Sequence, residues 1–332
     1  MIVCKEISFE DDLPWDKLVE QSTTATFFQT REWLSNWVKY WGKSGEVVIY
    51  AVFDNDELIG IAPFHITDKI NILGVPDPSQ SGSLSDFGDI IIKSGREKEV
   101  WQAVLRSIRK DPSTRPAQRG KLGMTNRENI KIELNFIREE SPSFGILKEL
   151  GGKIEVMEVS PRINLPAKWD EYLSTLNRHD RHEIRRKIRK IEEEGIIKYC
   201  DEINNQNINE FYRLMVASNE KKGNFLSLEM RDFFSEIIMQ SGTKKLLTLC
   251  FLRYNNENIA AILLLFQKNE MLLYNSGFEP KYSYLSPGLT LKAYSIKEAI
   301  ERGIKWYDFL RGGERYKYDL GGKERKLYRF TF

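Results

Sequence analysis

The sequence predicts an α/β (α+β) protein of two tandem domains, each a mixed and mostly antiparallel sheet flanked by helices. A chain of 332 residues is long enough for two domains of ordinary size. Segments with helical and strand spacing alternate along it. The two halves also share one order, in which helices precede a strand pair with an Asn/Asp turn, as in VVIYAVFDNDELIGIAPF and LTLCFLRYNNENIAAILLLF. This correspondence indicates an internal duplication.

Composition excludes several classes of protein. Apolar residues make up 41% and charged residues 30% of the chain, which is typical of a soluble globular protein. The net charge of +2 is too small to indicate nucleic-acid binding by itself, and no DNA partner is expected. The N-terminus lacks a secretory signal. The longest apolar run, at 259–266, is too short to span a membrane.

The cysteines and histidines show no spacing that would bind a metal ion. Cys4, Cys200 and Cys250 are far apart and odd in number, which is typical of a reducing compartment. Each is interpreted as a small core residue and not as a nucleophile. Two of the three histidines lie in a strongly basic segment, which is a poor setting for a cation. The expected location is the cytoplasm, and no metal is expected.

The first domain is predicted at residues 1–162. Its pattern predicts a strand at 2–9, helices at 15–21 and 30–41, strands at 46–53, 58–66 and 89–93, and helices at 97–109 and 143–150. Trp33, Trp37 and Trp41 recur four apart in the second helix, and such a stripe is ordinarily core packing. Residues 74–88 read as a loop, and 113–129 show no assignable pattern.

The second domain, residues 163–332, is predicted to open with a helix at 168–176 and a basic helix at about 177–194. Seven Lys or Arg and two acidic residues between positions 178 and 190 give a local charge of +5. A solvated helix face is the ordinary explanation of such a run. The functional alternative is a docking surface for an anionic ligand, either phosphate-bearing or an RNA backbone.

An antiparallel meander is predicted next. A strand at 196–201 and helices at 207–222 and 227–240 precede strands at 245–254, 258–267 and 270–277, which are joined by Asn-rich turns.

The stretch YNSGFEPKYSYLSPGLTLKAYSIKEAIERGIKWYDFLRGGERYK, residues 274–317, organises the second domain. It reads as strand, loop, helix, strand and loop. Ser286 is expected to cap the helix, and Pro287 suits its first position because no N–H donor is needed there. A helix N-terminus beside a strand end suits phosphate, although most capped helices bind nothing. The candidate cofactor-binding residues are Ser286, Pro287, Gly288, Leu289 and Thr290.

This stretch resembles the CelD-like, BcsL-type (cellulose-biosynthesis) family of GNAT N-acetyltransferases. FFQTREWLSNWVKYWG and NRHDRHEIRRKIRKIEEEG support the resemblance, which covers most of the chain and is weakest at about 111–135. It implies tandem GNAT-like domains akin to FemAB-type aminoacyl transferases, N-acyl transfer to an amine, and a link to exopolysaccharide or cell-envelope biosynthesis. The positions that match the family pattern are Tyr282, Ser286, Pro287, Gly288, Asp308, Arg311, Gly312, Tyr316 and Lys317.

The resemblance implies acyl-CoA, acetyl-CoA above all, as co-substrate. Acetyl-CoA-binding GNAT enzymes usually carry Arg/Gln-x-x-Gly-x-Gly/Ala at the helix start. Here the six residues that end at Gly288 are SYLSPG, and only the last position matches. This departure puts CoA in doubt as the donor.

Asp308 and Tyr282 are the candidate catalytic residues. In a strand at 304–310, Asp308 shares a face with apolar side chains. A carboxylate there either has a raised pKa, as suits a base, or is paired with a cation such as Arg311. We therefore expect Asp308 to act as the base or to orient the acceptor amine, with a structural ion pair as the alternative.

Further residues of the same stretch are candidates for binding an anionic or sugar acceptor, such as a nucleotide sugar. Arginine forks suit phosphate, and tyrosines can line a cleft, although buried tyrosines are usually packing. The candidates are Tyr274, Asn275, Tyr284, Arg311, Gly312, Arg315, Tyr316 and Lys317.

Two alternatives to an acyl-CoA-dependent enzyme stay open. The first is an aminoacyl-tRNA-dependent, FemAB-like transferase, in which the basic helix contacts RNA. The second is a non-catalytic binding module of a polysaccharide-synthesis assembly, which the poor CoA motif favours.

Overall fold

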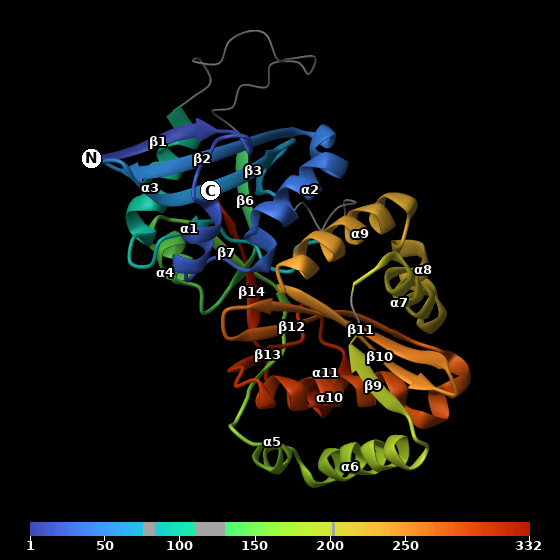
Figure 1. Cartoon of the computed structure of the whole chain (residues 1–332). Helices are drawn as coiled ribbons and strands as arrows, with labels where there is room; N and C mark the ends of the chain where they lie inside the picture. The colour runs from blue at the N-terminus through green and yellow to red at the C-terminus, as the bar shows by residue number, and fades with distance from the viewer. Residues whose placement is uncertain (76–83, 111–129, 201–202) are drawn as a thin grey trace. The chain divides into compact units, whose positions relative to one another are not determined.

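The computed structural model describes residues 1–75, 84–110, 130–200 and 203–332 (Figure 1). The predicted fold class is confirmed, because two mixed sheets flanked by helices make up two compact units. Unit 1 comprises Met1–Glu158 and Lys326–Phe332, and unit 2 comprises Val159–Arg325. The sequence prediction placed 326–332 in the second domain, whereas in the structure these residues belong to unit 1.

Unit 1 is built on one sheet, which includes the last strand of the chain. The strand order is β1 (Ile2–Ile7), β2 (Glu46–Asp54), β3 (Glu57–Ile66), β4 (Lys69–Ile72), β6 (Lys131–Arg138), β14 (Lys326–Thr331) and β7 (Lys153–Val159), and β5 (Ile91–Ile92) pairs with β3. Its helices are α1 (Trp15–Gln21), α2 (Arg31–Trp41), α3 (Glu97–Lys110) and α4 (Pro142–Glu149). The tryptophans of α2 are buried, so their interpretation as core packing is confirmed. The unassigned stretch 113–129 lies outside the described residues.

Unit 2 carries the second sheet, in the order β8 (Arg162–Asn164), β13 (Trp306–Asp308), β12 (Glu270–Phe278), β11 (Glu257–Gln267), β10 (Leu247–Tyr254) and β9 (Ile197–Cys200). The predicted meander is confirmed, since β9 to β12 pair antiparallel in sequence order. Asn255 and Asn256 take the left-handed conformation at the β10–β11 turn, which asparagine tolerates better than most residues.

Helices cover both faces of this sheet (Figure 1). They are α5 (Trp169–Thr175), α6 (Arg178–Glu193), α7 (Asn205–Ser218), α8 (Glu220–Phe225), α9 (Leu228–Thr243), α10 (Pro287–Glu301) and α11 (Arg315–Asp319). Helix α10 packs on β11 and β12, and α6 packs on α10, while α7 contacts β12 and α9 contacts β10. The single helix predicted at 207–222 is two helices, because Asn219 between them is extended, with φ −165° and ψ 124°.

Two of the three cysteines form a disulfide, which contradicts the reducing compartment expected from their odd number and wide spacing. Cys200 and Cys250 are directly opposite each other in the antiparallel β9–β10 register and are bonded. A separation of 50 residues gives no sign of this contact, since only the strand pairing creates it. Cysteine usage therefore does not support a reducing compartment. Among the described helices, none combines the length and hydrophobicity of a membrane span.

Candidate functional site

The candidate site lies in unit 2, where two parallel neighbouring strands part. β13 pairs with β12 at only three positions, from Glu270↔Trp306 to Leu272↔Asp308. β12 continues to Phe278, whereas the chain after Asp308 pairs with the segment before β8, where the Phe309 N–H donates to the Pro161 carbonyl over 3.0 Å. Among the described residues, β13 therefore does not pair with the second half of β12.

A β-bulge interrupts β12 at the point where the two strands part. The register with β11 passes from Leu264↔Leu273 to Leu263↔Asn275, so that Tyr274 is an extra residue on β12. Such bulges re-aim side chains and backbone groups and are frequent beside active sites. The Tyr274 ring packs on Phe234, with centroids 5.6 Å apart. The Asn275 side chain accepts a hydrogen bond from the Ser276 N–H.

Gly277 fixes how closely α7 approaches β12. A Cβ atom on Gly277 would lie 2.4 to 2.5 Å from backbone atoms of Leu214 and Met215 in α7. Those contacts are backbone atoms and cannot move aside as a flexible side chain could. The glycine therefore allows the helix to lie directly on the second half of β12.

The segment that follows β12 leads into the start of α10. A 3-10 helix, η4 (Pro280–Leu285), ends at Ser286, which has a left-handed φ of 53° and whose side chain makes no capping hydrogen bond. The expected serine cap is therefore wrong, whereas Pro287 does occupy the first helical turn. Ser286 and Leu289 are partly exposed, while Pro287, Gly288 and Thr290 are buried. The N–H groups of Gly288 and Leu289 lie in the first turn of α10 and have no acceptor within the helix.

Tyr282 belongs to a hydrogen-bonded group at this loop. Its hydroxyl donates to Glu257 Oε2 over 2.9 Å, and Lys281 Nζ lies 2.8 Å from the other carboxylate oxygen. The hydrogen bond to the Glu257 carboxylate raises the pKa of Tyr282. The hydroxyl proton of Tyr282 is therefore engaged by the Glu257 carboxylate.

Asp308 is fully buried within a polar network. Its carboxylate accepts hydrogen bonds from Arg325 Nη2 at 2.7 Å, from the Leu310 N–H at 2.8 Å and from the Ser160 hydroxyl at 3.1 Å. The strand pattern correctly predicted a buried carboxylate on this face. The cation paired with it is Arg325, which the sequence reasoning did not consider, and the geometry is that of the structural ion pair.

The glycine loop after β13 is held from within by Lys317. The Lys317 side chain is only 2% exposed. Its ammonium group lies 3.0 Å from the Leu310 and Gly312 carbonyls, also contacts the Arg311 carbonyl, and pairs with Glu314 at 2.9 Å. Gly312 supplies the positive φ of 104° that the loop needs.

The other candidates in this loop point elsewhere. The Arg315 side chain is 93% exposed, and its Nε lies 3.6 Å from Asp319. The structure therefore does not bring Arg315 together with Lys317. The Tyr316 ring packs edge-on against Phe309, and burial raises its pKa.

Lys292 is a residue of this region that the sequence reasoning missed. It is 8% exposed, donates to the Gly288 carbonyl over 3.2 Å, and lies 4.8 Å from the centre of the Tyr316 ring. Its position was a usable signal, because it falls three residues after Leu289 and four before Ile296, on the apolar face of the predicted helix.

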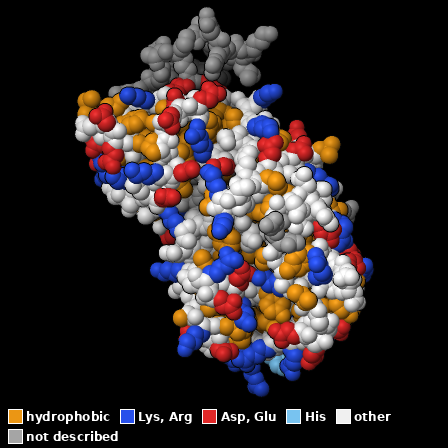
Figure 2. Space-filling view, viewed as in Figure 1, with side chains coloured by type: hydrophobic (Ala, Val, Ile, Leu, Met, Phe, Trp, Pro, Cys, Tyr) orange, Lys and Arg blue, Asp and Glu red, His pale blue; other side chains and the backbone are white. Residues whose placement is uncertain are grey.

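The basic helix α6 contacts the 3-10 helix η4. Lys190 Nζ donates to the Tyr284 carbonyl over 3.1 Å and lies over the Tyr284 ring, which is 60% exposed. Figure 2 shows Lys and Arg side chains gathered at the lower edge of unit 2, where α6 lies. Arg178, Arg185 and Arg189 are among the exposed ones.

Comparison with known proteins supports the architecture. Residues 178–318 match the model of the Acetyltransferase (GNAT) domain, so the GNAT part of the predicted resemblance is confirmed for this segment, while its CelD-like assignment stays a prediction. No curated protein matches the sequence.

Solved structures match almost the whole chain. FemX covers 99% of this chain and 96% of its own, with a TM-score of 0.69 at 14% identity. L-PGS from Bacillus licheniformis covers 96% and 91%, with a TM-score of 0.60 at 10% identity. A tandem GNAT protein from the clavulanic acid biosynthesis pathway covers 100% and 98%, with a TM-score of 0.51 at 7% identity. At these identities the similarity shows the fold, and the fold is that of tandem GNAT proteins.

Proposed function

We propose that unit 2 holds the acyl-transfer site of a GNAT-type N-acyltransferase of the CelD-like kind. The acyl group passes from an activated donor, acyl-CoA in the first instance, to an amine of a sugar, nucleotide sugar or envelope precursor. The observation that carries the proposal is the separation of β12 from β13 beside the bulge at Tyr274. The expected setting is exopolysaccharide or cell-envelope biosynthesis.

The reaction forms an amide and releases a thiol. The acceptor amine gives up a proton, its nitrogen attacks the carbonyl carbon of the thioester, and the thiolate leaves and takes up a proton. Backbone N–H groups at the Tyr274 bulge are suited to stabilise the developing oxyanion. The hydroxyl of Tyr282, the tyrosine expected to be catalytic, is bonded to Glu257 at the β10–β11 turn, so this residue is not assigned the proton of the thiolate.

Other residues position the two substrates in this proposal. Asp308 acts by holding the loop after β13, because three hydrogen-bond donors already surround its carboxylate. Lys317 holds the same loop, and Tyr284 and Arg311 flank the acceptor. The start of α10 holds the donor phosphates through the Gly288 and Leu289 N–H groups.

A ligand titration tests the donor. Purified protein is mixed with acetyl-CoA, longer acyl-CoAs and desulfo-CoA, and thermal unfolding is followed. A ligand at a hundredfold excess over its dissociation constant stabilises the native state by about 2.7 kcal/mol. A saturable rise in melting temperature is expected. If none of these compounds shifts the transition, acyl-CoA is not the donor.

A charge substitution in α10 locates the donor. Leu289→Glu places a carboxylate in the first turn, where it favours the helix dipole but repels phosphate. We expect CoA affinity to fall at least tenfold. Lys297→Glu, on the same helix away from its start, is the matched control. Equal affinities of the two variants would place the donor elsewhere.

A second donor is favoured by one specific contact. The Lys190 side chain joins the basic helix α6 to Tyr284, two residues before Ser286. A polyanion bound along α6 would therefore reach the same loop. In this alternative the donor is an aminoacyl-tRNA, and the transferred group is an amino acid.

Salt dependence separates the two donors. Binding of RNA to α6 should weaken steeply as the salt concentration rises. The slope of the logarithm of the binding constant against the logarithm of the salt concentration should become shallower by about 0.7 to 0.9 for each phosphate contact that is lost. Arg185→Gln with Arg189→Gln should reduce the slope of tRNA binding and leave CoA binding unchanged. A protein that binds a donor and an acceptor but never forms product would instead be a non-catalytic module.

A further inference from the structure

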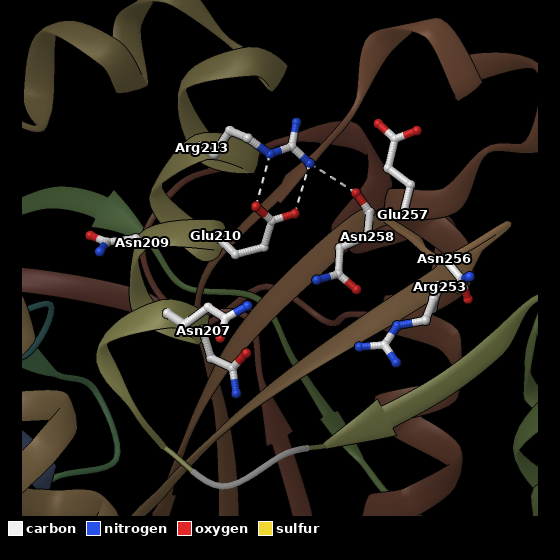
Figure 3. A pocket seen from close by; sticks show the side chains of 9 residues that line it. Asn207, Asn209, Glu210, Arg213, Arg253, Asn256, Glu257 and Asn258 are labelled. Carbon is white, nitrogen blue, oxygen red and sulfur yellow. Dashed lines mark hydrogen bonds and ion pairs between the residues drawn. The ribbon is translucent and has the colours of Figure 1, made fainter.

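A polar cavity lies at one end of the sheet of unit 2, away from the bulge. Its volume is about 990 Å³, and it is lined by the first three turns of α7 and by the turn between β10 and β11 (Figure 3). The lining side chains are five amides, two arginines and two glutamates. Among the described residues, no aromatic or aliphatic side chain lines it, which distinguishes it from the mostly apolar pockets that bind drug-like ligands.

Most charges in the cavity are neutralised within the protein. Arg213 forms a two-pronged pair with Glu210, at 2.9 and 2.8 Å, and a third bond of 2.7 Å to Glu279. Glu257 is held by Lys281 and Tyr282. The cavity therefore offers no excess of cations to a multiply charged phosphate or nucleotide.

Arg253 is the exception among these charges. Its Nη2 donates to the Tyr199 hydroxyl over 2.8 Å, and its guanidinium lies 4.2 Å from the centre of that ring. No carboxylate of the described residues pairs with it. The Tyr199 hydroxyl in turn donates to Asn258 over 2.6 Å, so that the arginine is held flat at the cavity wall with other N–H groups still available.

The amides supply the rest of the recognition surface. Asn209, on α7, and Asn256, in the β10–β11 turn, line the cavity and are exposed. Each amide offers two N–H donors and a carbonyl acceptor. Alternating donors and acceptors match the hydroxyl groups of a sugar ring, each of which both donates and accepts.

We propose that this cavity is a saccharide-binding subsite, with Asn209, Asn256 and Arg253 as its contact residues. Arg253 takes a ring hydroxyl, or the carboxylate when the sugar is a uronic acid. The role of the subsite in anchoring the acceptor rests on the proposed function, whereas its binding of a saccharide does not.

The distance to the bulge defines that role. Along β11, Asn258 lies five residues from Leu263, which is opposite the bulge. At about 3.3 Å per residue this separation is roughly 17 Å. A single sugar in the cavity is therefore out of reach of the reacting centre. The subsite anchors one end of an oligosaccharide while an amine further along the same chain is acylated.

Calorimetric titration of the full-length protein, with no donor present, tests the subsite. The probes are a glucosamine tetramer, a glucuronic-acid-containing tetramer, glucosamine itself and UDP-N-acetylglucosamine. At least one tetramer should bind more tightly than either small compound. Tighter binding of the nucleotide sugar than of both tetramers would overturn the proposal.

Variants locate the binding. Asn209→Ala with Asn256→Gly, a glycine being free of strain at the positive φ of position 256, should weaken tetramer binding about tenfold, as expected for two lost hydrogen-bonding side chains. Arg253→Gln should weaken the glucuronic-acid tetramer most. Asn205→Ala, an exposed amide of α7 outside the cavity, is the matched control and should change nothing. Equal affinity of the double variant and the control would overturn the proposal.

The outcomes also separate this inference from the proposed function. A protein that binds the tetramer through these residues but acylates no amine would retain the subsite and lose the function. A protein that acylates an amine with the same KM after the double substitution would retain the function and lose the subsite.

Discussion

At the residue scale, Asp308 shows what strand alternation can predict. Its place on the apolar face of β13 predicted a buried carboxylate, and the side chain is fully buried. Alternation along the strand does not reveal which cation pairs with the carboxylate, because that depends on where a later segment of the chain packs beside β13. Lys323 forms a bridge with Arg162, beside β13, and this contact brings Arg325 to Asp308. The nearby Arg311 was the natural guess, since sequence shows proximity only along the chain.

Asp308→Asn should therefore destabilise unit 2. The substitution keeps the shape of the side chain but leaves the buried Arg325 without its counter-charge, a change that typically costs about 3 to 5 kcal/mol. Urea unfolding measures the loss. Glu149→Gln, which breaks an exposed pair with Lys98, is the control and should cost less than about 1 kcal/mol. Unchanged stability with abolished turnover would restore Asp308 as the catalytic base.

Asp89 in unit 1 predicts a dependence of stability on pH. Burial raises its pKa to about 6, although hydrogen bonds from Ser141 and Ser143 oppose the shift. The folded state then binds more protons than the unfolded state between about pH 4 and 6, so stability falls as pH rises through that window. A shift of about two pKa units corresponds to roughly 3 kcal/mol.

Asp89→Asn should remove this slope, because the amide cannot ionise. The free energy of unfolding of unit 1, measured in urea from pH 4 to pH 7, should decline with pH in the unmodified protein and be flatter in the variant. Glu149→Gln should leave the slope as it is. Identical slopes in Asp89→Asn and the unmodified protein would show that folding does not raise the pKa of this carboxyl.

At the scale of elements, the hydrophobic pattern located α10 and the meander, and missed what depends on backbone detail. Pro287 marked the start of α10 correctly. Ser286 adopts a left-handed φ, which turns its side chain away from a capping role. The bulge at Tyr274 could not be recognised from the sequence. The strand shows no regular alternation of polar and apolar side chains that one extra residue would interrupt.

Gly277→Ala tests the contact between α7 and β12. The added methyl group would lie 2.4 Å from backbone atoms of α7, so helix and strand must separate. Overpacking of this kind costs typically about 1 to 3 kcal/mol, and donor binding should weaken because the second half of β12 moves. Both are measured by thermal unfolding with and without acyl-CoA.

Gly145→Ala in α4 is the matched control. A Cβ atom added to Gly145 would meet no heavy atom of the described neighbouring residues within 4 Å, and the φ of this glycine is not positive. Alanine in an exposed helical position should stabilise unit 1 by up to about 1 kcal/mol. If Gly277→Ala were equally harmless, the close approach of α7 would not be what positions β12.

At the scale of the whole molecule, the division into two units was predictable and the path of the chain was not. Repetition of helices and strand pairs indicated two domains. The final strand was assigned to the second domain because it follows it in sequence. In the structure β14 lies between β6 and β7 of unit 1, so the chain enters unit 2 after Glu158 and leaves it at Arg325. Periodicity identifies a strand but cannot choose its sheet.

This path predicts that damage at the C-terminus unfolds the N-terminal unit. Phe330 is completely buried in β14, and Phe330→Asp would place an unpaired charge there, at a cost of at least about 4 kcal/mol. Hydrogen exchange should show lost protection in β6 and β7 while β10 to β12 keep theirs. Lys326→Gln, at an exposed position of the same strand, should leave both units protected. Loss of protection confined to β10–β12 would contradict the assignment of β14 to unit 1. Loss of protection in unit 1 alone would show that the two units unfold as separate cooperative structures, although the chain joins them twice.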